Sequence, residues 1–260
     1  MSNPIHSTSA KSVLPMLAMR GLATGLCAGC VVGLLRLSHD RAAARVALWL
    51  EEWREVWWTV PIWFVVLVAL AVILRRIVRE EPLISGSGIP QTELALAGRL
   101  SFTWWRVLLA KFLGSWLALF GGLALGREGP SIQMGGAVGA GFHALWRPAA
   151  PHALTGSPYV VAGAVAGLAA AFGAPAAGVL FAFEEMKSRR DTSLIVAACA
   201  SAIGAHLMIR IVFGMGRILP FAGFEAPPLS SFWIVALEGV TEPEGDPAAF
   251  VAAAGRIRLT

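Results

Sequence analysis

The sequence predicts an all-α integral membrane protein that includes broken and re-entrant helices. Three observations lead to this fold class. Apolar residues make up 57% of the 260 residues and charged residues only 14%, whereas soluble domains carry roughly 25% charged residues. Ten tryptophans accompany a single tyrosine, a bias typical of the aromatic belts at membrane–water interfaces. Glycine and proline interrupt the later apolar runs, where a helix cannot continue unbroken.

The first two apolar runs are long enough to be membrane helices. The run 13–35 exceeds the apolar region of a signal peptide, so we expect a helix that stays in the protein. An amphipathic stretch separates it from the run 60–74. That run ends in an arginine cluster made of Arg75, Arg76 and Arg79. The positive-inside rule places this cluster in the cytoplasm. The N-terminus, one hairpin earlier and carrying Lys11, is then expected to be cytoplasmic too, in a multi-pass inner or plasma membrane protein.

Four further apolar runs cover residues 103–125, 131–146, 158–183 and 193–213. Pro175 lies inside the third of these, and proline disfavours helical geometry in the residue before it. We therefore expect two helices, 158–172 and 175–187, with a break between them. Broken helices at membrane depth are tolerated where they line a cavity, and they indicate a transport site. The spacing of Gly163 and Gly167 favours close helix packing over chemistry.

Charge and cysteine content indicate no other class of protein. The net charge of +5 comes mostly from arginines at the ends of apolar runs, which is a topology signal and no indication of nucleic-acid binding. Cys27 and Cys30 form a C-x-x-C inside an apolar helix, and we interpret them as small buried residues without metal or redox chemistry. No nucleophile–base pair, metal-ligand cluster or phosphate loop with its lysine is recognisable. We expect neither an enzyme nor a cofactor.

Two short motifs share one design. "GSGIP" covers 86–90 and "GREGP" covers 126–130, each a glycine-rich turn with a proline where a helix begins. Glycine lets the backbone approach a ligand closely. A helix N-terminus offers free N–H groups and a partial positive charge, which attract anions without a full charge. Either motif alone is more readily explained as a well-capped turn.

Four segments resemble, in their order along the chain, the CLC family of chloride channels and proton-coupled chloride transporters. They are "GSGIP", "WWRVLLAKFLG" at 104–114, "GREGPSIQMGG" and "GLAAAFGAPAAGVLFAFEEM" at 167–186. The resemblance runs from about residue 13 to residue 235. It implies a CLC-type fold of inverted repeats, of which this chain holds the first. It also implies a homodimer in the lipid bilayer, in which each subunit has its own pathway for chloride, and protons as the second transported ion.

The resemblance assigns roles to individual residues. Chloride-binding turns would consist of Gly86, Ser87, Gly88, Ile89 and Pro90 in the first motif and of Gly126, Arg127, Gly129 and Pro130 in the second. Ser87 resembles the serine whose hydroxyl contacts the central anion. Glu128 resembles the gating glutamate, a carboxylate that occupies the anion site and swings away when protonated. We interpret the side chain of Arg127 as structural, an anchor at the aqueous edge.

Glu185 resembles the internal proton-relay glutamate of the exchangers, which favours exchange over passive conduction. Glu184 beside it would either hydrate the inner proton route or face the cytoplasm. Lys111 matches a lysine in the family's corresponding helix; it would line the pathway or extend its long stem to the aqueous edge.

The resemblance stops early. The second half of family members supplies a G-x-F-x-P turn and a tyrosine that complete the anion site, and Tyr159, the single tyrosine here, lies too early. We divide the chain into a cytoplasmic segment 1–12, a first-repeat membrane domain 13–228 and a divergent tail 229–260. The abrupt change from an apolar run that ends at residue 240 to a polar, proline-rich stretch favours a truncated or frameshifted reading frame over a natural half-length family member. The 260-residue chain by itself is then expected not to transport chloride selectively, because the second-half ligands of the anion site would be missing. Three hypotheses remain: a chloride/proton exchanger, a passive chloride channel, and a non-transporting membrane fragment.

Overall fold

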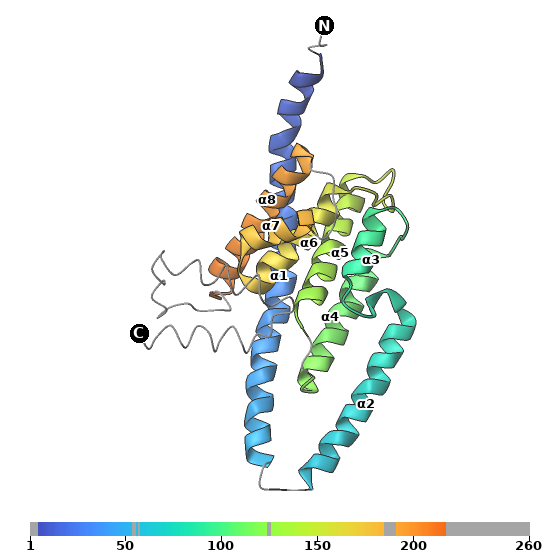
Figure 1. The fold of residues 1–260 in the computed structure, drawn as a ribbon, viewed down its shortest axis with the longest axis vertical. Coiled ribbons are helices and arrows are strands. Elements are labelled where there is room, and N and C mark those ends of the chain that lie inside the picture. The colour runs from blue at the N-terminus through green and yellow to red at the C-terminus, as the bar shows by residue number, and fades with distance from the viewer. Residues whose placement is uncertain (1–4, 54–55, 57, 124–125, 185–190, 217–260) are drawn as a thin grey trace, which may run out of the picture. The chain divides into compact units, whose positions relative to one another are not determined.

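The computed structural model describes residues 5–53, 56, 58–123, 126–184 and 191–216, and within them every regular element is a helix. The first half contains α1 (Ile5–Trp53), α2 (Thr59–Glu80), a single 3-10 turn (Pro82–Ile84) and α3 (Ile89–Leu96). The rest contains α4 (Trp104–Phe120), α5 (Glu128–Trp146), α6 (Pro158–Phe172), α7 (Pro175–Glu184) and α8 (Thr192–Leu207), which continues as a π turn (Met208–Val212) (Figure 1). The all-α prediction is confirmed.

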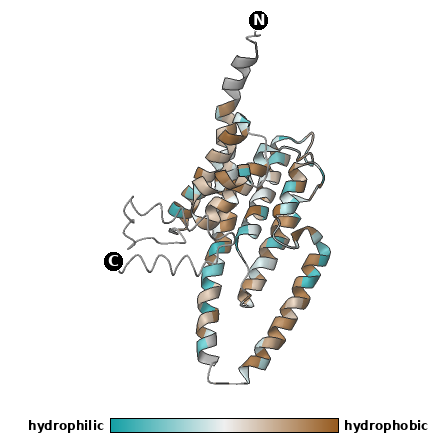
Figure 2. Cartoon of the chain, viewed as in Figure 1, coloured by the Kyte–Doolittle hydropathy of each residue, from teal (hydrophilic) through white to brown (hydrophobic). Residues whose placement is uncertain are grey.

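Three of the described helices are long and apolar enough to cross a membrane: Leu14–Trp49, Thr59–Glu80 and Thr192–Val212. They match the first, second and last predicted runs. The amphipathic stretch after the first run is no separate element, because α1 continues through it to Trp53. Residues 34–53 contain neither glycine nor proline and are rich in alanine, leucine and arginine, which favour helix. Figure 2 shows the resulting contrast between the mixed hydropathy of this part of α1 and the apolar α2.

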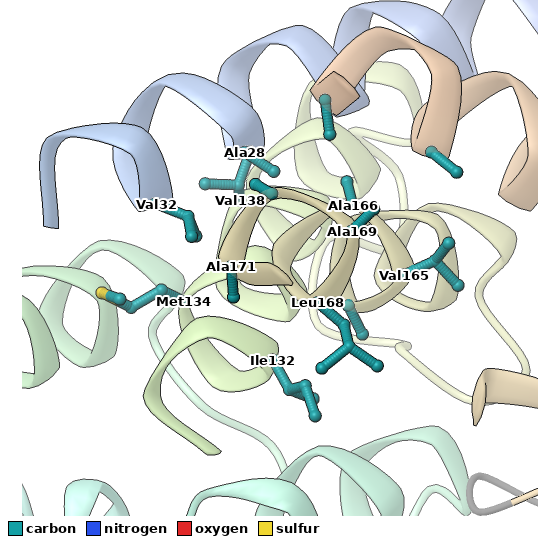
Figure 3. Close-up of a cluster of buried hydrophobic side chains, with 14 of the residues drawn as sticks. Ala28, Val32, Ile132, Met134, Val138, Val165, Ala166, Leu168, Ala169 and Ala171 are labelled. Carbon is teal, nitrogen blue, oxygen red and sulfur yellow. The ribbon is translucent and has the colours of Figure 1, made fainter. Parts of the chain in front are cut away.

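The centre of the core is α6, which is buried from Tyr159 to Ala171. It packs against α5, α8 and α1, and Figure 3 shows apolar side chains from these helices surrounding it. The contact with α5 needs glycine. A Cβ on Gly163 would collide with the carbonyl oxygen of Gly135, and one on Gly167 with that of Ser131. The predicted close packing at these two glycines is confirmed.

The contact between α1 and α8 is likewise made by glycines that let two backbones approach closely. Gly21, Gly25 and Gly29 of α1 lie against the backbones of Ala197, Ser201 and Ala205, respectively, on α8. The Ser201 hydroxyl donates across to the carbonyl oxygen of Ala162 on α6 at 2.7 Å. Close backbone contacts between α5 and α6 and between α1 and α8, with the Ser201 hydrogen bond between α8 and α6, hold these four helices together, and this bundle supports the turns described below.

The predicted break after α6 is present. Gly173 takes a left-handed conformation with φ of 68°, and its N–H donates to the carbonyl oxygen of Ala169 at 2.8 Å. Pro175 then starts α7. The predicted bounds 158–172 agree with α6, whereas the predicted end of the next helix, at 187, lies outside the described residues.

One cysteine prediction is wrong. Cys27 is exposed, as is Cys199, while Cys30 is half-buried. The physical reason lies in helix periodicity: Cys27 is two residues from both Gly25 and Gly29, on the side of α1 opposite to α8.

Candidate functional site

The two glycine-rich motifs lie directly against each other. Gly129 contacts the backbone of Ser87 so closely that a Cβ on Gly129 would meet the Ser87 carbonyl oxygen and lie 2.8 Å from the Ser87 Cα. Gly88 contacts the side chain of Gln133 on α5 in the same manner. The structure therefore brings together the two turns that the sequence analysis predicted to hold one anion.

The first turn depends on left-handed glycines. Gly86 has φ of 70° and Gly88 has φ of 93°, values that side-chain-bearing residues rarely adopt. The helix α3 begins at Ile89, with Pro90 in its first turn as predicted. The N–H of Ile89 donates to the hydroxyl oxygen of Ser87 at 3.4 Å, and Ser87 itself is exposed. The hydroxyl oxygen accepts, so the hydroxyl proton stays available to a ligand.

Side chains hold four consecutive carbonyl groups just before this turn. The carbonyl oxygen of Leu83 accepts from Gln133 Nε2 at 2.7 Å, and that of Ser85 accepts from Gln91 Nε2 at 2.8 Å. Lys111 Nζ donates to the carbonyl oxygens of Ile84 and Gly86, at 2.8 and 2.7 Å. We call these three side chains, from Gln91, Lys111 and Gln133, the carbonyl clamp.

Of the three clamp residues, only Lys111 was predicted to have a role, and its predicted extension to the aqueous edge is wrong. Lys111 is buried, with 5% of its surface exposed, so its ammonium does not extend to an aqueous edge. The two glutamines were missed. One signal could have indicated Gln133: it is an amide in the middle of a glycine-rich apolar run, where an uncharged polar side chain needs a hydrogen-bond partner.

The turn leaves amide groups free. Among the described residues no hydrogen-bond partner is found for the N–H groups of Gly86, Ser87 and Gly88. Two more free N–H groups are expected in the first turn of α5, where a helix has no internal partner for them. These amides belong to the two turns that meet at Ser87 and Gly129.

The second turn places an acid at this helix start. The helix α5 begins at Glu128, three residues before the predicted run, and the Glu128 side chain is exposed. A carboxylate in the first turn is favoured by the helix dipole. Gly126 has open space around it. Arg127 makes an ion pair with Asp40 of α1, with N and O 3.9 Å apart, and both side chains are partly exposed. This contact agrees with the structural role expected of Arg127.

The inner acids are only partly described. Glu184 is exposed at the end of α7. Glu185, the predicted proton relay, lies outside the described residues, as does the predicted tail 229–260. No structural statement about either follows.

A family model for the voltage gated chloride channel matches residues 64–241. The chain is 37% identical over 222 residues to the H(+)/Cl(−) exchange transporter ClcA of Vibrio cholerae serotype O1, covering 82% of this chain and 47% of the relative. It is 33% identical over 232 residues to the transporter of the same name from Klebsiella pneumoniae, covering 88% of this chain and 48% of the relative. The chain thus spans about half the length of the curated relatives it matches.

Solved structures show the same fold. A slow cyanobacterial Cl−/H+ antiporter matches with a TM-score of 0.67 and 31% identity, over 85% of this chain and 53% of the other. A CLC-type fluoride/proton antiporter matches with a TM-score of 0.57 over 92% of this chain and 56% of the other, at 18% identity, which supports likeness of fold alone.

Proposed function

Because the chain belongs to the voltage gated chloride channel family, we propose that it takes part in chloride transport across a membrane by exchange for protons. The observation that carries the proposal is the contact between Gly129 and Ser87, which joins two turns with free amide groups at one point. The similarity to chloride/proton exchangers supports the same function.

The turns supply the chemistry of a weak anion site. Free N–H groups and the Ser87 hydroxyl are neutral donors, and the starts of α3 and α5 add the positive ends of two helix dipoles. Such a site attracts chloride without binding it through a full positive charge, so the ion can leave again. Gly86, Gly88, Ile89, Pro90, Gly126 and Pro130 shape the two turns in this proposal.

Glu128 would couple the anion to the proton. Its carboxylate lies at the start of α5 and can occupy the same anion site in place of chloride. Protonation removes that attraction and frees the site. In the proposal Glu185 passes the proton on the cytoplasmic side, and the neighbouring Glu184 hydrates that route. The working unit is a homodimer in the inner membrane, with its N-terminus in the cytoplasm.

Transport assays test the proposal. The purified chain is reconstituted into liposomes loaded with chloride, and chloride efflux and proton uptake are recorded together. The exchange proposal predicts that chloride efflux drives proton uptake. Ser87→Ala should reduce both fluxes. Ser38→Ala should change neither, because within the described part of the chain the Ser38 hydroxyl bonds to nothing but the Leu34 carbonyl of its own helix, at 2.8 Å.

The other hypotheses correspond to other results of this assay. Chloride efflux without proton uptake would replace the exchanger by a passive channel. Fluxes no larger than those of empty liposomes would contradict transport by this chain.

A further inference from the structure

Lys111 is a buried lysine whose ammonium serves backbone carbonyls. The two hydrogen bonds to Ile84 and Gly86 are its recorded contacts, and no carboxylate pairs with it among the described residues. Burial of an ammonium is costly unless strong hydrogen bonds replace its water. The placement is therefore expected to serve the turn that Lys111 contacts.

Peptide geometry converts the carbonyl contacts into amide orientation. Each peptide group here is trans, so a C=O and the N–H of the next residue point in opposite directions. When Lys111 holds the Gly86 carbonyl, the N–H of Ser87 must point away from Lys111. When Gln91 holds the Ser85 carbonyl, the N–H of Gly86 must likewise point away from Gln91. These are two of the free amides of the turn.

We propose that Lys111 is a positioning residue of the anion site, which keeps the amide N–H of Ser87 directed at the anion by holding the Gly86 carbonyl on the opposite side. The proposal rests on the proposed chloride function. The ammonium does not itself bind chloride. It fixes the orientation of the peptide group whose N–H, that of Ser87, binds the anion.

The need for such a lock follows from Gly86. A glycine tolerates both senses of the adjoining peptide group, so the peptide between Gly86 and Ser87 could rotate at little steric cost. Rotation would turn the carbonyl dipole toward the anion and repel it. The charge-assisted hydrogen bond from the Lys111 ammonium to the Gly86 carbonyl opposes this rotation more strongly than a hydrogen bond from a neutral amide would.

The first test measures the turn itself, without any transport. Amide hydrogen exchange is followed on the purified chain in detergent, for the wild type and for Lys111→Met. The amides of Ile84 and Ser85 donate to the carbonyl oxygens of Glu81 and Pro82, both at 3.2 Å, and report on local opening. We expect these two amides to exchange about tenfold faster in Lys111→Met, since a hydrogen bond of ordinary strength changes an opening equilibrium by about that factor.

Ser201→Ala is the matched control. It removes a buried side-chain-to-backbone hydrogen bond between α8 and α6 while leaving the turn intact. Its exchange at Ile84 and Ser85 should equal that of the wild type. A lysine that merely stabilised the fold would speed exchange throughout α4 and α5 and not at the turn alone. Lys111→Gln, which keeps a neutral amide as donor group, should fall between the wild type and Lys111→Met, and it serves if the methionine variant does not fold.

The second test uses chloride as the probe. In the wild type, chloride in place of gluconate should slow exchange at Gly86 and Ser87, and this protection should drop at least tenfold in Lys111→Met. Wild-type exchange at the turn in both lysine variants would overturn the proposal. A turn loosened by the substitution but never protected by chloride would leave the anchoring role standing and would contradict the anion role, and with it the proposed function.

Discussion

The backbone of Gly129, at the start of α5, lies against the backbone of Ser87, just before α3, with no space for a side chain between them. In the sequence the two residues are separated by α3 and α4. Their contact defines the distance between the Ser87 hydroxyl and the first turn of α5. A small displacement here changes the geometry of every proposed anion ligand at once.

Gly129→Ala should therefore separate the two turns. Its Cβ would lie 2.8 Å from the Ser87 Cα, and overpacking of this kind costs about 1–3 kcal/mol. We expect a lower unfolding temperature in detergent and a loss of chloride efflux. Gly126→Ala is the control for the unfolding temperature, because a Cβ there meets nothing within 4 Å. Equal behaviour of the two variants would contradict the contact.

Gly163→Ala should destabilise the core. Its Cβ would collide with the Gly135 carbonyl oxygen, and backbone cannot move aside as a side chain can. We expect a loss of about 1–3 kcal/mol or more, seen as a lower thermal midpoint. Gly114→Ala makes the same change on α4 with its nearest neighbours at 3.9 and 4.0 Å. Helix propensity should leave that variant neutral or up to about 1 kcal/mol more stable.

Glu128→Gln imitates the protonated carboxyl group permanently. We expect chloride efflux to continue while proton uptake stops, because an amide neither competes as an anion nor binds and releases a proton. Simultaneous pH and chloride recordings from liposomes measure both ions. Glu51→Gln, at an exposed position in the last turn of α1 and far from both turns in the sequence, should leave coupling unchanged. Undiminished proton uptake in Glu128→Gln would refute the gating assignment.

Glu185→Gln should also stop proton uptake while chloride still passes, since the inner relay loses its titrating group. The neighbouring Glu184→Gln gives the comparison that the sequence left open. A slower but persistent proton flux would assign Glu184 to hydration of the route, and an unchanged flux would assign it to the cytoplasmic surface. Normal coupling in Glu185→Gln would remove the main support for exchange.

Local patterns predicted much of the fold. Glycine and proline positions determined the break at Gly173, the start of α3 and the crossing at Gly163, because these depend on residues close in sequence or on the mere absence of a side chain. The carbonyl clamp depends on partners 27 and 50 residues apart, from Lys111 to Ile84 and from Gln133 to Leu83. No spacing rule connects such residues, and a lysine in an apolar helix is ordinarily expected to reach water.

The unbroken course of α1 was missed for a different reason. The sequence changes from apolar to amphipathic after residue 35, and this change suggests that the first helix ends there. The helix nevertheless continues to Trp53, because the residues that follow favour helical geometry. Hydropathy predicts where a helix meets lipid, and backbone propensity determines where it ends.

The glycine contacts of α5 with α6 also have a mechanical consequence. Because backbone touches backbone at Gly135, Gly139, Gly163 and Gly167, neither helix can slide or rotate past the other without a collision. We therefore expect the two helices to move together as one unit. In the proposed transport cycle, movement would then fall to side chains and to the left-handed residue Gly173, after which the next helix begins.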